Sequence, residues 1–99
     1  MSNQQKSQTN QNQSQIRIQD NLPGAEYANL MQVGHNKEEF LLTFMNIVGP
    51  TGRVCSKVII SPGHMKRMIS ALEDNLKKYE SQFGNVEQAE APSSLGFKA

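Results

Sequence analysis

Apolar residues recur at strand spacing over three stretches of this chain, and the spacing then becomes helical. The strand-like stretches are residues 25–33, 39–48 and 53–61. Successive side chains of a strand point to opposite faces, and apolar residues two positions apart share a face in each stretch, so each predicts a β-strand. The segments 34–38 and 49–52 are rich in Gly, Asn and Pro, which predicts hairpin turns between the strands.

A shorter alternation precedes these strands, in "QIRIQ" at residues 15–19. Ile16 and Ile18 would share one face, which makes this segment a candidate for a fourth strand. The sequence "DNLPG" follows directly and contains four residue types that favour turns.

Residues 61–84 predict one long helix with a marked start and a marked end. Ser61 suits the N-cap, Pro62 suits the first helical position, and Gly84 suits the position after the last turn. The apolar residues recur at steps of three and four and form one stripe: Met65, Met68, Ile69, Leu72, Leu76, Tyr79 and Phe83.

The order of elements predicts an α+β fold. We expect an antiparallel sheet of three to four strands, followed by one long C-terminal amphipathic helix, in a single domain over residues 15–84. Residues 1–14 are almost entirely Gln, Asn, Ser and Thr and predict a disordered tail. Residues 85–99 predict a flexible C-terminal tail.

The strand at 39–48 is apolar on both faces, which indicates a partner. One helix covers only one face of a sheet, and an antiparallel sheet usually leaves its other face polar. The second face is therefore expected to meet another chain or a ligand, and a second copy in a dimer is the favoured choice. The expected oligomer or partner face comprises Leu41, Leu42, Phe44, Met45 and Ile47.

The size of the foldable part supports the same interpretation. A core of this size is marginal alone and usually needs a disulfide, a metal or a partner chain. The chain has a single cysteine, Cys55, so no intramolecular disulfide can form, and no zinc-ligand spacing is present. Oligomerisation is the remaining means of stabilisation.

Charge and hydropathy exclude some partners and suggest a compartment. The formal net charge is +1, which gives little long-range attraction for nucleic acid or an anionic membrane. No apolar run approaches the ~20 residues that span a bilayer, and the N-terminus lacks the apolar core of a secretory signal. We therefore expect a cytoplasmic protein.

Candidate catalytic groups are few and isolated. His35 falls in a predicted turn, His64 in the first helical turn, and Cys55 in mid-strand away from any helix N-terminus that would lower its pKa. Glu38 and Glu39 are adjacent, so in a strand they point to opposite faces. The sequence predicts no enzyme, no metal site and no cofactor.

Single-stranded nucleic acid is the alternative ligand, because a sheet with exposed aromatic and basic residues can stack bases. Tyr27, Arg53 and Lys57 fall on predicted strands, with Arg53 and Lys57 on the same side as Cys55 and Ile59. Phosphate contacts would come from Arg17 and Lys37.

Several motifs resemble a family of small bacterial and archaeal proteins that is known only as a domain of unknown function. They are Tyr-Ala-Asn at 27–29, Ser-Pro-x-His-x-Lys at 61–66, and Asn-x-x-x-Tyr-Glu with Phe-Gly at 75–84. Asn36 and the "FMN" at 44–46 depart from residues common in that family. The resemblance implies kinship and no mechanism.

A weaker, architectural resemblance connects the predicted elements to known binding proteins. Four strands and a helix are similar to PUR-repeat and Whirly single-stranded nucleic-acid binders, and comparable to SecB-type export chaperones. Such likeness implies function by analogy only. We therefore expect a non-enzymatic, homo-oligomeric binding or scaffolding protein whose partner is a protein or an unfolded client, with nucleic-acid binding as the alternative.

Overall fold

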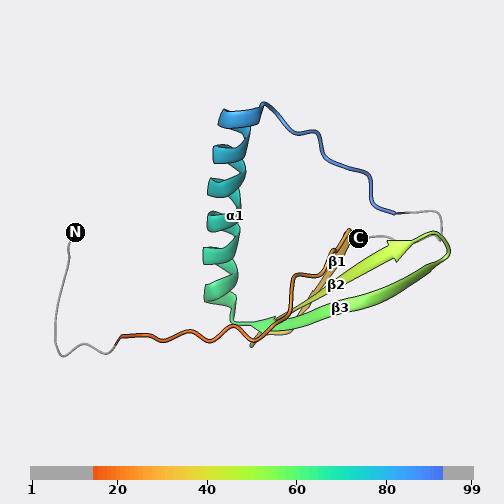
Figure 1. The fold of residues 1–99 in the computed structure, drawn as a ribbon. Coiled ribbons are helices and arrows are strands. Elements are labelled where there is room, and N and C mark those ends of the chain that lie inside the picture. Colours follow the sequence, from red (N-terminus) through yellow and green to blue (C-terminus); the bar gives the residue numbers. More distant parts are fainter. Residues whose placement is uncertain (1–14, 93–99) are drawn as a thin grey trace.

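The computed structural model describes residues 15–92, which form a three-stranded sheet followed by one helix (Figure 1). The elements are β1 (Leu30–His35), β2 (Phe40–Val48), β3 (Thr51–Ile60) and α1 (Pro62–Phe83). The predicted tail at 1–14 and the end of the C-terminal tail, 93–99, lie outside the described residues.

The sheet is antiparallel, with β2 between β1 and β3. This confirms the α+β prediction with three strands. Residues 15–19 lie in no strand, so the fourth-strand candidate does not join the sheet. The first predicted strand was also displaced: it was expected over 25–33, whereas β1 begins at Leu30 and continues to His35.

The turn between β1 and β2 is built around Asn36. Its Oδ1 accepts hydrogen bonds from the backbone N–H groups of Glu38 and Glu39, at 2.8 and 3.0 Å. Its own N–H donates to the Glu39 carbonyl at 3.0 Å. Asn is favoured in turns because its side chain can bond its own following backbone in this way. The turn places His35 opposite Phe40, with ring centroids 5.3 Å apart.

The β2–β3 hairpin turns tightly and then contains a bulge. Gly49 has a φ of 60° between Val48 and Thr51, which pair directly. Farther along, Phe44 pairs with Ser56 and Met45 with Val54, so Cys55 is an extra residue on β3.

A bulge shifts the alternation of the strand by one residue. Arg53 now pairs with Asn46, and Lys57 pairs with Thr43. Residues that pair directly across antiparallel strands share a face. Arg53 and Lys57 therefore lie on opposite faces, and the prediction that they share one was wrong.

The register defines two faces of the sheet. We call the first the Leu42 face; its β2 residues are Phe40, Leu42, Phe44, Asn46 and Val48, and their partners are His35, Val33, Met31, Ile60, Val58, Ser56, Arg53 and Thr51. We call the second the Met45 face; its β2 residues are Leu41, Thr43, Met45 and Ile47, and their partners are Gly34, Gln32, Leu30, Ile59, Lys57, Val54 and Gly52.

Both ends of α1 have the predicted caps. The Ser61 hydroxyl accepts from the His64 N–H at 3.1 Å, and Pro62 occupies the first turn. At the other end Gly84 has a φ of 96°, a value that strains residues with a Cβ, and its N–H donates to the Glu80 carbonyl. The Glu80 carboxylate also accepts from the Val86 N–H at 2.9 Å, which ties the following segment to the helix end.

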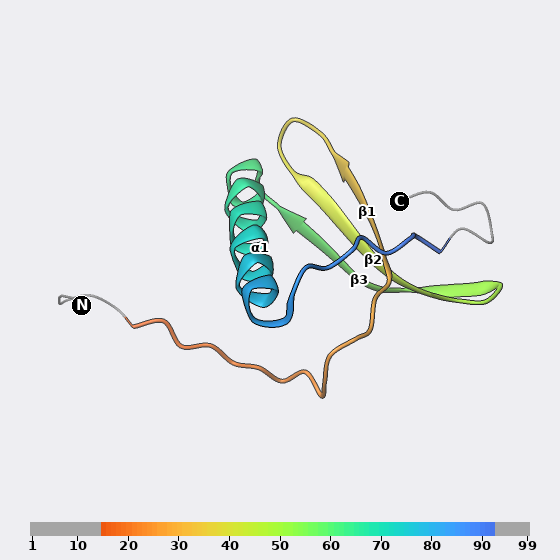
Figure 2. The same cartoon turned by 90° about the horizontal axis from the view of Figure 1, so that it is seen from above.

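The helix contacts the sheet only near its start. Figures 1 and 2 show α1 beginning at the end of β3 and rising away from the strands. At this end of the sheet Leu42 is buried and Phe40 and Ile60 are half-buried, whereas Leu41 and Ile59 on the other face are exposed. Because Met65 and Met68 are half-buried too, the first turns of α1 shield the Leu42 face.

The buried core of the protomer is very small. Leu30, Met45 and Ile47 form one cluster on the Met45 face, and Leu42 is buried on the other face. No residue of α1 is buried. A 22-residue amphipathic helix that buries no side chain leaves its apolar stripe without a complement.

Candidate protein-binding surface

A continuous row of exposed apolar side chains follows the part of the α1 stripe beyond Met68, which we call the outer stripe. Residues three and four positions apart share a helix face, so the outer stripe continues the face that Met65 presents to the sheet. Its side chains project beyond the strands and are exposed to solvent. The exposed fraction is 65% for Leu72 and 68% for Phe83. The outer stripe comprises Ile69, Leu72, Leu76, Tyr79 and Phe83.

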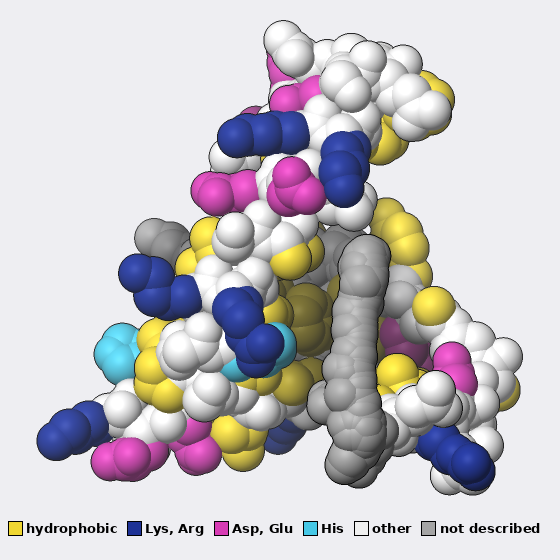
Figure 3. All heavy atoms as spheres, turned by 90° about the vertical axis from the view of Figure 1, so that its left-hand side faces the viewer, with side chains coloured by type: hydrophobic (Ala, Val, Ile, Leu, Met, Phe, Trp, Pro, Cys, Tyr) yellow, Lys and Arg dark blue, Asp and Glu magenta, His cyan; other side chains and the backbone are white. Residues whose placement is uncertain are grey.

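Charged side chains of α1 lie elsewhere on the helix. Figure 3 shows Lys and Asp or Glu side chains gathered over its upper half. Lys78 pairs with Asp74 at 3.3 Å, as the i,i+4 spacing predicts. The helix thus has a solvated face and an apolar face, and the apolar face is open to solvent in the protomer.

A second apolar area lies on the Leu42 face of the sheet. Met31, Val33 and Val58 are exposed, although they neighbour the buried Leu42. The first turns of α1 therefore shield only part of this face, and Met31, Val33 and Val58 on the outer strands stay open to solvent.

On the Met45 face a shallow hollow surrounds Leu41 and Ile59. The two side chains pair across β2 and β3, and Gly34 on β1 contributes no side chain beside them. The hollow has a volume of about 260 Å³, and its rim includes His35, Asn36 and Glu39. Ile59 is 61% exposed. An apolar floor with a polar rim suits one hydrophobic side chain of an extended peptide.

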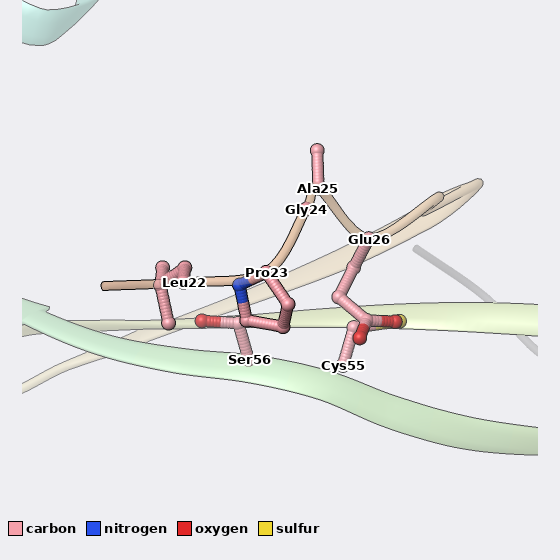
Figure 4. A pocket seen from close by; sticks show the side chains of 7 residues that line it. All are labelled: Leu22, Pro23, Gly24, Ala25, Glu26, Cys55 and Ser56. Carbon is pink, nitrogen blue, oxygen red and sulfur yellow. The ribbon is translucent and has the colours of Figure 1, made fainter. Parts of the chain in front are cut away.

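A larger cavity lies between β3 and the segment that leads to β1. It measures about 730 Å³, and Figure 4 shows Cys55 and Ser56 projecting from β3 toward residues 22–26. The Cys55 thiol donates to the Tyr27 carbonyl at 3.4 Å, which holds the segment at one point. The cavity wall is mainly small and apolar, and it contains one carboxylate, Glu26, which is paired with Arg53.

The residues expected to bind nucleic acid are spread over the molecule. Tyr27 is exposed but precedes β1, Arg17 lies in the segment before the sheet, and Lys37 lies in the β1–β2 turn. Arg53 forms an ion pair with Glu26, and Lys57 is on the other face of the sheet. These positions do not form a continuous basic path.

The residues expected to form the oligomer or partner face are divided between interior and surface. Leu42, Met45 and Ile47 are buried within the protomer, which takes them out of reach of a partner. Phe44 is half-buried, and Leu41 is exposed beside Ile59. Among these five, Leu41 is therefore the most accessible to another chain.

Sequence reasoning missed the role of Asn29. Its side chain makes two hydrogen bonds to the backbone of Ile47 and extends the pairing of β1 with β2. The Tyr-Ala-Asn motif was visible in the sequence, but an Asn in an alternating segment does not indicate that its amide replaces a strand residue.

The structure adds two observations on chemistry. Within residues 15–92, no three His, Cys, Asp or Glu side chains gather as metal ligands would. In the same range, no helix is both long enough and apolar enough to cross a membrane.

The comparisons with known proteins agree with the motifs. Residues 1–88 match a family described as "Protein of unknown function (DUF3467)". The match covers most of the chain, so the protein belongs to this family. Searches of curated proteins and of solved structures found no match.

Proposed function

We propose that this protein is a non-enzymatic, homo-oligomeric binding or scaffolding protein whose partner is another protein, in particular an unfolded segment. The observation that carries the proposal is the imbalance between the four hydrophobic residues that are buried within residues 15–92 and the large apolar area left on α1 and the sheet. Exposed contiguous apolar surface is typical of interaction sites.

Two surfaces support two kinds of contact. The outer stripe lies on a long, regular helix and suits a permanent contact with a folded partner. The Leu41–Ile59 hollow is shallow and rimmed by polar groups, which suits exchangeable contact with single hydrophobic side chains. β1, which contains Gly34, is an edge strand of the described sheet, and such an edge suits pairing with an extended chain.

Nucleic acid receives less support. Arg53 is already neutralised by Glu26, and the bulge separates it from Lys57. Binding to single strands depends on several phosphate contacts and therefore weakens steeply as salt rises. An apolar interaction with an unfolded protein depends much less on salt.

The test compares two probes: a fluorescent, reduced and carboxymethylated protein that stays unfolded, and a labelled single-stranded oligonucleotide. We expect the unfolded protein to bind at both low and high salt, and the oligonucleotide not to bind. Tight oligonucleotide binding that disappears at high salt would reverse the order of the two functions. Failure of both probes would contradict a binding function of either kind.

Variants locate the site. Ile59→Ser removes an exposed side chain from the hollow and should weaken binding of the unfolded protein without changing the mass in solution. Val48→Ser, at the opposite end of the hairpin, changes a residue of similar exposure and serves as the matched control. Equal binding by the two variants would exclude the hollow.

A further inference from the structure

The outer stripe has a spacing that a helix packed on its own sheet does not need. Apart from Met68, the stripe residues from Met65 to Phe83 recur at alternating steps of four and three, so that any two successive steps span seven residues, which is a heptad repeat. That repeat keeps one narrow seam in contact with a second helix, whereas a helix that packs on a sheet usually carries a wider stripe. The apolar stripe of α1 is wider only at Met68, which is half-buried near the sheet.

We propose that the outer stripe forms a short, parallel, two-stranded coiled coil with the outer stripe of a second copy of this chain. The inference rests on the homo-oligomer of the proposed function, and it names the interface and the orientation of the two copies. The sheets then lie at the same end of the helix pair.

The seam residues bear on the number of helices in the bundle. In heptad terms Ile69, Leu76 and Phe83 occupy a positions, and Leu72 and Tyr79 occupy d positions. A β-branched residue at a with Leu at d, as in Ile69 and Leu72, favours two strands over three or four in a parallel coiled coil. Tyr79 and Phe83 already pack together in the protomer, with ring centroids 5.0 Å apart.

The charges beside the seam indicate the parallel orientation. Glu73 and Glu80 flank it on one side, and the neutral Asn75 and Gln82 flank it on the other. In a parallel pair each glutamate side faces a neutral side. In an antiparallel pair centred on Leu76, Glu73 would face Glu80 of the second copy, and like charges repel.

The link between sheet and helix holds the outer stripe away from its own strands. Ser61 alone separates Ile60 of β3 from Pro62 of α1, and it caps the helix through its hydroxyl. The Ser61 carbonyl also accepts from the Met65 N–H at 3.0 Å. The direction of α1 is thus set at its first turn, and Figure 1 shows its far end well clear of the strands.

The first test places a charge in the seam. Leu76→Glu buries two carboxylates in the dimer and should raise the dissociation constant about a hundredfold or more. Ser81→Glu adds the same charge on the exposed, opposite side of the helix and should leave the dissociation constant close to that of the wild type. Sedimentation equilibrium over a range of concentrations measures both.

The second test reads orientation from disulfide formation in a Cys55→Ser background. In a parallel pair Leu72 meets Leu72 of the second copy, so Leu72→Cys should form a disulfide-linked dimer under mild oxidation. Asp74→Cys, two residues away on the outer side, should not. This test uses a nearly intact seam and remains decisive if Leu76→Glu fails to fold.

The outcomes separate this interface from the proposed function. A wild-type chain that stays at the 11.0 kDa of the monomer overturns both the homo-oligomer and the coiled coil. A wild-type dimer that survives Leu76→Glu, or that cross-links equally well through Asp74→Cys, overturns the coiled coil alone. A wild-type monomer that binds unfolded protein through the outer stripe overturns the coiled coil and replaces it with a client site.

Discussion

The side chain of Asn29 pairs with the backbone of Ile47 as a strand residue would. Its Oδ1 accepts from the Ile47 N–H and its Nδ2 donates to the Ile47 carbonyl, both at 2.9 Å. The Asn29 N–H also donates to the Met45 carbonyl at 3.0 Å. Asn29 thus provides hydrogen-bond partners for three backbone groups of β2, which are the N–H and carbonyl of Ile47 and the carbonyl of Met45. These groups lie beside the core cluster of Leu30, Met45 and Ile47.

Removal of this amide should destabilise the sheet. Asn29→Ala leaves a partly buried N–H and C=O of Ile47 without partners, and the expected loss is about 1–3 kcal/mol in the free energy of unfolding. Urea unfolding at a fixed protein concentration measures it. Asn36→Ala loses bonds in an exposed turn and should cost less, so an equal or larger loss at Asn36 would contradict the role given to Asn29.

Gly52 and Ile47 should show coupled mutational effects. A Cβ on Gly52 would overlap the Ile47 Cδ1, so Gly52→Ala should overpack the core and cost about 1–3 kcal/mol. Ile47→Val removes the Cδ1 atom and should relieve most of that cost in the double variant. A double-mutant cycle measures the coupling, and additive losses would show that the contact is relieved in another way.

The helix start depends on the Ser61 hydroxyl. Ser61→Ala should lower the free energy of unfolding by about 1 kcal/mol, because the His64 N–H loses its acceptor. Ser61→Asp keeps an acceptor and should retain most of the stability. Thermal or urea unfolding of the two variants checks the cap, and equal losses would show that the hydroxyl is not what stabilises this end.

The helix end depends on the backbone of Gly84. Gly84→Ala places a Cβ at a φ of 96° and should destabilise the end of α1 by about 1 kcal/mol or more. Gly24→Ala is a matched control, because nothing lies near that position and its φ is not in the left-handed region. Hydrogen exchange over the last turn of α1 should rise in Gly84→Ala and stay unchanged in Gly24→Ala.

Local signals in the sequence predicted most of the elements. The caps of α1 and the apolar stripe depend on neighbouring residues and were readable in full. The two turns were located for the same reason, because Asn36 and Gly49 favour turns through their own chemistry. The bounds of β2, β3 and α1 follow the predicted ones closely.

Features that depend on distant contacts were not readable. The start of β1 was misplaced because Asn29 replaces strand pairing with a side chain, which requires Ile47 to lie opposite. The extra residue at Cys55 reverses the alternation of β3, and nothing in the local sequence marks it. The direction of α1 was also hidden, since periodicity shows that a helix has an apolar face and not what covers it.

The exposure of α1 has a consequence for stability. If a second copy covers the outer stripe, folding and association are linked, and the unfolding midpoint should rise with protein concentration. A tenfold change in concentration that leaves the midpoint unchanged would contradict this linkage. Unfolding followed by circular dichroism at several concentrations provides the measurement.

The mass of the folded chain in solution tests the central claim most directly. Light scattering coupled to size exclusion at micromolar concentration should give at least twice the 11.0 kDa of the protomer. A cooperative, stable monomer of 11.0 kDa with Leu72 and Phe83 still in contact with water would show that this apolar surface needs no second copy.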